Sequence, residues 1–111
     1  MKVFYPRWLP VHGIAVNTGL VLIRRDHEKD AGLHAHEWQH ARQMRDFGAV
    51  KWWLLYLVSR DFRLRMETEA YRESVKFSPH RLEHFAQTLS GWWPYFLGIS
   101  VERARELLTA P

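Results

Sequence analysis

Residues 33–47 constrain the fold most, because their helical periodicity places two histidines among apolar residues. With about 100° per residue, one side of the predicted helix gathers Leu33, His36, His40, Met44 and Phe47. The opposite side carries charged residues, namely Arg42, Arg45 and Asp46. An apolar helix face packs into a core, and buried polar groups there need partners. The chain must therefore bring a shared partner to the two imidazoles, and a metal ion is an economical one.

The same segment contains His36-Glu37-Trp38-Gln39-His40, which fits the pattern H-E-x-x-H. Two histidines four residues apart lie on adjacent turns of one helix face, so both can ligate one Zn²⁺. Glu37 follows about 100° around the helix, where it can act as general base toward a water held by the metal. His34 lies about 200° from His36 and is predicted to be a bystander.

A catalytic zinc site needs a third protein ligand, and the chain has no cysteine. The predicted helix over 63–77 offers Glu67, Glu69 and Glu73. Glu67 lies away from the cationic stripe of this helix and is favoured as the inward ligand. Glu69 lies beside that stripe and is better explained as a surface ion-pair partner, although it stays the alternative ligand.

A second pattern, H-x-x-E-H, occurs at His80, Glu83 and His84. Here the apolar residues of the predicted helix lie on the side opposite the two histidines. This segment therefore predicts a solvated helix face rather than a metal site.

The H-E-x-x-H motif followed by Glu67 on a later helix resembles the gluzincin zinc metallopeptidases. In length and layout the chain is similar to their smallest members, the minigluzincins, over about residues 13–77. The resemblance implies a zincin-like fold, a Zn²⁺ cofactor held by His36, His40 and Glu67, and Glu37 as the catalytic base. It also implies an extended peptide substrate that pairs with an upstream strand, here expected at 20–24.

The chain departs from that family at Tyr71. Many gluzincins carry Asp four residues after the ligand glutamate, where it orients a ligand histidine. Tyr71 is the candidate for accepting that hydrogen bond, or for stabilising an oxyanion. Metal binding is therefore a firmer expectation than proteolysis.

The remaining segments predict a single α+β domain over 1–111, mostly helical with a short N-terminal hairpin. Residues 1–12 are expected to be an irregular arm, and most of the six tryptophans are expected to fill the core. The predicted strands are 14–16 and 20–24, joined by a turn at 17–19, and the predicted helices are 33–47, 50–58, 63–77, 79–90 and 100–108. The helix over 50–58 is expected to be largely buried, and Ser78 and Ser100 are expected to cap the helices that follow them.

Charge and hydropathy leave two other functions open. A net charge of +4 from scattered residues gives no strong nucleic-acid signal. No segment reads as a signal peptide or as a transmembrane helix, so a cytoplasmic protein is expected, possibly encoded by a phage or mobile element. The alternatives to a peptidase are a catalytically silent zinc protein that binds a peptide, and a basic, Trp-rich protein acting at membranes or nucleic acid. The sequence predicts neither a substrate nor an oligomeric state.

Overall fold

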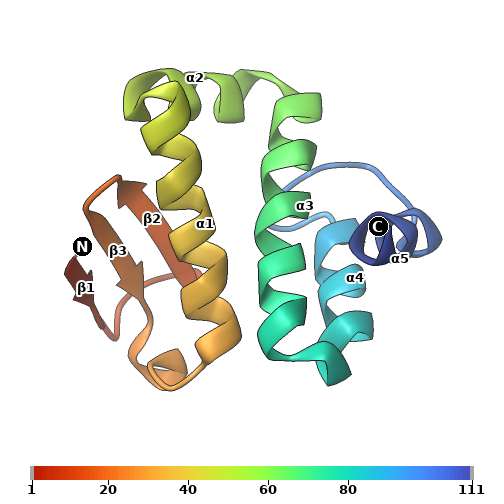
Figure 1. Ribbon diagram of the computed structural model, residues 1–111, viewed down its shortest axis with the longest axis horizontal. Helices are drawn as coiled ribbons and strands as arrows, with labels where there is room; N and C mark the ends of the chain where they lie inside the picture. Colours follow the sequence, from red (N-terminus) through yellow and green to blue (C-terminus); the bar gives the residue numbers. More distant parts are fainter. Residues whose placement is uncertain (1, 111) are drawn as a thin grey trace.

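A computed structural model describes residues 2–110 as a small three-stranded sheet followed by five α-helices (Figure 1). The strands are β1 Lys2–Phe4, β2 Gly13–Asn17 and β3 Leu20–Ile23. The helices are α1 Ala31–Phe47, α2 Ala49–Val58, α3 Arg60–Phe77, α4 Leu82–Ser90 and α5 Val101–Thr109, with 3₁₀ turns η1 Arg25–His27 and η2 Pro79–Arg81. The mostly helical α+β class predicted from the sequence is confirmed.

The strand order is β1-β3-β2, so β3 is central and β2 forms an edge. β2 and β3 form the expected hairpin, and Asn17 accepts a hydrogen bond from the Gly19 amide in the turn. β1 pairs in parallel with β3, with Val3 opposite Val21. The expectation of an irregular N-terminal arm is therefore wrong for residues 2–4. A strand of three residues is too short to show an alternation of apolar and polar side chains. Its pairing partner, β3, begins sixteen or more positions further along the chain.

Two helices begin earlier in the sequence than their periodicity predicted, because a capping residue precedes each of them. Asp30 accepts the Leu33 amide and begins α1 at Ala31, and Ser59 accepts the Phe62 amide and begins α3 at Arg60. Ser100 caps α5 as expected. Ser78 makes no side-chain capping bond, and Pro79 begins a 3₁₀ turn ahead of α4.

α1 and α3 lie side by side (Figure 1). α3 contributes residues to two apolar clusters. One cluster joins the sheet to α1, α2 and α3 through Ala15, Val21, Ile23, Met44, Trp52 and Met66. The other joins α3 to α4, α5 and the segment before α5 through Tyr71, Phe85, Ala86, Leu89, Leu97, Ala104 and Leu108. The inward faces of α1 and α3 therefore meet between the two clusters.

The expectation that the second helix is largely buried is wrong. Within α2 only Trp52 is buried, while Val50, Leu54, Leu57 and Val58 are 58–79% exposed. α2 bridges the ends of α1 and α3 at the top of the view in Figure 1, so it packs through one face only. Most tryptophans are likewise outside the core: Trp8, Trp38, Trp92 and Trp93 are at least 40% exposed.

None of the helices between residues 2 and 110 is long and apolar enough to cross a membrane.

Candidate metal centre

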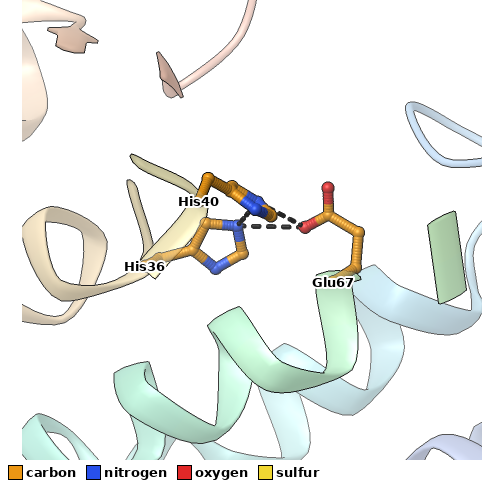
Figure 2. Close-up of side chains that lie close together, drawn as sticks. All are labelled: His36, His40 and Glu67. Atoms are coloured by element: carbon orange, nitrogen blue, oxygen red, sulfur yellow. Dashed lines mark hydrogen bonds and ion pairs between the residues drawn. The ribbon is translucent and has the colours of Figure 1, made fainter. Parts of the chain in front are cut away.

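His36, His40 and Glu67 converge between α1 and α3. The His40 Nε2 atom lies 3.2 Å from His36 Nε2 and 3.1 Å from Glu67 Oε1, and His36 Nε2 lies 3.1 Å from the same oxygen. Figure 2 shows the two imidazoles from α1 facing the carboxylate from α3. All three side chains are buried.

This triangle of donor atoms matches the size of a zinc coordination face. Zinc bonds of 2.0–2.1 Å in a tetrahedron place neighbouring ligand atoms about 3.3–3.4 Å apart. The observed separations of 3.1–3.2 Å differ from that by a few tenths of an ångström. Two imidazole nitrogens and one carboxylate oxygen are also a donor set of known catalytic zinc sites. The residues present therefore fit a zinc ion.

The three candidate glutamates of α3 point in the directions that the helical periodicity predicts. Glu67 faces inward and is 2% exposed. Glu69 pairs with Arg65 at 3.6 Å, and Glu73 pairs with Arg42 and Lys76. Between the two candidates for the third ligand, only Glu67 meets the histidines.

Glu37 lies beside this triangle and is buried. Its Oε1 is 3.8 Å from His36 Nε2, and its Oε2 has no hydrogen-bond partner among the described residues. Burial raises the pKa of Glu37, against the opposing influence of the two imidazoles. A buried carboxylate with a free oxygen and a raised pKa suits a group that accepts a proton from water and returns it.

His40 and Glu67 form a coupled ion pair in the absence of metal. Burial by itself lowers the pKa of His40, but the charge and hydrogen bond of Glu67 outweigh it and raise the pKa to about 9. Burial likewise raises the pKa of Glu67, yet the neighbouring imidazoles hold it well below its usual range. A metal ion bound here would have to displace the His40 proton, since both neutralise the same buried carboxylate.

Gln43 holds His40 in the orientation that metal binding needs, and the sequence analysis did not identify it. Its Oε1 accepts hydrogen bonds from His40 Nδ1 at 2.9 Å and Trp52 Nε1 at 3.3 Å. Its Nε2 donates to the Met66 carbonyl and to Glu69. With Nδ1 protonated toward Gln43, the Nε2 lone pair is directed at the metal position. The spacing of three residues from His40 on one helix was the available signal.

Tyr56 was also not identified. Its hydroxyl donates to Glu67 Oε2, which leaves Glu67 Oε1 to face the histidines. Nothing in the sequence links Tyr56 with a carboxylate on the next helix, because the contact depends on how α2 packs on α3.

Tyr71 makes no hydrogen bond to His36 or His40 among the described residues. Its ring packs edge-on against His36 with centroids 4.3 Å apart, while its hydroxyl lies 2.7 Å from the Tyr95 hydroxyl. The Nδ1 atom of His36 has no partner among the described residues. Tyr71 therefore positions His36 by ring contact, and the candidate ligand oriented by a hydrogen bond is His40, through Gln43.

A cleft of about 380 Å³ opens above the ligand triangle. One wall is residues 10–15, leading into and along β2, and the other is Thr88, Trp93, Pro94 and Tyr95. The expectation that β3 would pair with a peptide is wrong, because β3 is flanked on both sides by strands. β2 is the edge strand beside the cleft. The sequence cannot distinguish the two, since the choice depends on where β1 pairs.

The other histidine patterns lie outside this centre, as expected. His34 Nδ1–H donates to the Asp30 carbonyl, and its Nε2 lies 3.2 Å from the Tyr5 hydroxyl. His80, Glu83 and His84 are exposed, and Glu83 pairs with Arg105 at 2.7 Å. Among residues 2–110, the group of metal-ligand side chains that converges is His36, His40 and Glu67.

Comparison with protein-family models, with curated proteins and with solved structures finds no match to this chain.

Proposed function

We propose that the protein is a zinc-dependent peptidase of the gluzincin type. The observation that carries this proposal is the buried triangle of His36 Nε2, His40 Nε2 and Glu67 Oε1, with edges of 3.1–3.2 Å. A structural zinc site would have four protein ligands, whereas this triangle offers three and leaves a position for water. Glu37, adjacent to the triangle, adds a base for hydrolysis.

Zinc held by these side chains would supply an acidified water and a Lewis acid for a peptide carbonyl. Glu37, whose Oε2 has no partner among the described residues, would take a proton from water at this site and return it to the amine released from the peptide bond. Gln43 keeps His40 in the tautomer that ligates through Nε2. Tyr56 donates its hydroxyl proton to Glu67 Oε2, so Oε1 is the oxygen that would remain available to a metal.

The cleft supports an extended peptide as substrate. The edge of β2 lies along one wall, and an edge strand offers backbone hydrogen bonds to another chain. The Tyr71 and Tyr95 hydroxyls form a hydrogen-bonded pair from α3 and the opposite wall. A hydroxyl of this pair is a candidate donor to an oxyanion formed during attack.

The test combines metal content with turnover. Protein purified without added metal is analysed for zinc, and then incubated with a peptide library whose products are identified by mass spectrometry. The proposal predicts about one zinc per chain and cleavage by the wild type. In Glu37→Gln we expect zinc to be retained and cleavage to fall by at least about 1,000-fold, since the general base is lost.

Two outcomes would contradict parts of the proposal. Zinc with no cleavage of any peptide, and equal peptide binding by wild type and Glu37→Gln, would identify a catalytically silent binding module. Equal zinc content in wild type, His36→Ala and Glu67→Ala would show that the metal is held elsewhere.

A further inference from the structure

The indole of Trp53 occupies the edge of β2 at one end of the cleft. Its Nε1–H donates to the Val16 carbonyl at 2.9 Å. Trp53 comes from α2 and packs against Trp52 and Tyr56, with ring centroids 5.0 and 5.7 Å apart. This indole is therefore held in place by its neighbours rather than lying free on the surface.

The alternation of the hairpin determines which backbone groups of β2 face the cleft. The Arg24 amide donates to the His12 carbonyl, and the register continues with Gly13 opposite Ile23 and Ala15 opposite Val21. Bonded and non-bonded pairs alternate in an antiparallel ladder. The amide and carbonyl groups of Gly13 and Ala15 consequently point away from β3, toward an incoming chain.

Beyond Ala15 this free edge stops. A bulge interrupts the register between Ala15 and Asn17, and the Val16 carbonyl is already bonded to Trp53. The cleft is lined by residues 10–15 and by Trp53, whereas Val16 does not line it. At the other end, residues 10–12 precede β2 and also line the cleft.

We infer that Trp53 is a specificity-determining residue that ends the peptide-binding edge and so restricts substrates to those with a short segment before the scissile bond. The inference rests on the proposed peptidase function. Glu37 adjoins Gly13, which places the reacting carbonyl near that residue. From Gly13 to Val16 is three residues, or about 10 Å of extended chain.

An antiparallel peptide, the more stable pairing, places its N-terminal residues at the Val16 end of β2. About three residues then fit between the scissile bond and Trp53. The substrate class is therefore a peptide cut close to its N-terminus, whose C-terminal side runs past residues 10–12 of the cleft lining, away from Trp53.

Oligoalanine hydroxamates carrying one to six alanines test this limit without turnover. The hydroxamate chelates zinc and directs all alanines to the N-terminal side. Titration calorimetry on the zinc-loaded wild type should show affinity rising to about three alanines and no further. In Trp53→Ala we expect six alanines to bind about 5-fold more tightly than three, because the Val16 carbonyl is released to accept one further hydrogen bond. Trp38→Ala, which removes a tryptophan outside the cleft lining, should behave as wild type.

Malonyl hydroxamates of oligoalanine amides, which extend to the C-terminal side, should show no such ceiling. If Trp53→Ala does not fold, Trp53→Phe replaces it, since that change removes the N–H bonded to Val16 and reduces the ring. Wild-type affinity that keeps rising to six alanines would overturn the inference. So would a ceiling that neither Trp53 variant relieves, a ceiling found only with the malonyl series, or no hydroxamate binding at any length.

These outcomes are separable from those of the proposed function. A ceiling relieved by the Trp53 variants, in a protein that cleaves no peptide, supports the inference about binding and contradicts hydrolysis. Peptide cleavage by a protein whose hydroxamate affinity keeps rising with the number of alanines supports the peptidase function and contradicts the inference about Trp53.

Discussion

The Glu37 side chain lies directly against the bare backbone of Gly13. A Cβ added at Gly13 would sit 3.2 Å from Glu37 Cγ and 3.3 Å from Glu37 Oε2, and the Leu22 carbonyl would be 3.3 Å away. Because this last neighbour is backbone of the central strand, the added carbon cannot move away from Glu37. The edge strand thus approaches the proposed base closely only because residue 13 has no side chain.

Gly13→Ala is expected to lower peptide turnover by about 10- to 100-fold, since a small displacement of a reacting group is costly. Zinc content should stay at the wild-type level, because the ligands are not touched. Gly19→Ala is the matched control, because its Cβ would meet only Asn17 Oδ1, at 3.7 Å. Full turnover by Gly13→Ala would show that Glu37 tolerates displacement.

Glu67→Gln should abolish the stabilisation that zinc gives to the fold. A metal at 100 times its Kd raises the free energy of unfolding by about 2.7 kcal/mol when it binds only the folded state. Thermal unfolding with and without zinc measures this difference. Glu69→Gln should retain it, because Glu69 contacts Gln43 and Arg65 rather than the histidines. The reverse pattern would make Glu69 the third ligand.

Gln43→Leu is expected to weaken zinc binding by about 10- to 100-fold, since the Nδ1–H of His40 loses its acceptor. Tyr71→Phe keeps the ring against His36 and removes only the hydroxyl bonded to Tyr95, so its zinc affinity should match the wild type. Competition with a zinc-binding dye measures both variants. A larger loss in Tyr71→Phe than in Gln43→Leu would place the orienting contact on His36 instead.

Without metal, the stability of the fold should decrease as the solution becomes alkaline. The pKa of His40 rises from 6.5 to about 9 on folding. A raised pKa stabilises the folded state fully below pH 6.5, and this contribution is lost as the pH rises through 9. Urea unfolding of the metal-free protein at pH 6, 7.5 and 9 should show the decline. Glu67→Gln should show less of it, because the carboxylate that raises the pKa is gone.

Zinc must displace the proton of His40, so its apparent affinity should increase with pH up to about 9. Calorimetry in buffers of different ionisation enthalpy should detect proton release near pH 7. A zinc affinity independent of pH between 6.5 and 9 would contradict a raised pKa at a His40 that binds the metal.

Leu89→Ala and Leu57→Ala should differ strongly in their effect on stability. Leu89 is fully buried in the cluster shared by α3, α4 and α5, whereas Leu57 is 70% exposed on α2. We expect a loss of about 2–5 kcal/mol for Leu89→Ala and of less than about 0.5 kcal/mol for Leu57→Ala, measured by urea unfolding. A similar loss in both would mean that the outer face of α2 is covered in solution.

Local patterns predicted the candidate ligands because the ligands depend on helix geometry. His36 and His40 share a face at any packing of α1, and Glu67 lies opposite the cationic stripe of α3 whatever covers it. The burial of α2 was mispredicted for the converse reason. Its residues are apolar all round, and only the position of α2 across the ends of α1 and α3 exposes Leu54 and Leu57.

The sequence by itself determined a mostly helical α+β domain, a H-E-x-x-H helix and an inward Glu67, because each follows from a repeat of 3.6 or 2 residues. Tertiary structure alone decided that these ligands lie within 3.2 Å of one another, that Gln43 and Tyr56 support them, and that β2 rather than β3 borders the cleft. It also placed Gly13 against Glu37 and Trp53 against Val16. Apart from the Gln43–His40 bond within α1, these contacts join residues of separate elements, as in the Tyr56–Glu67 bond across 11 positions and the Trp53–Val16 bond across 37. No local periodicity specifies how separate elements pack.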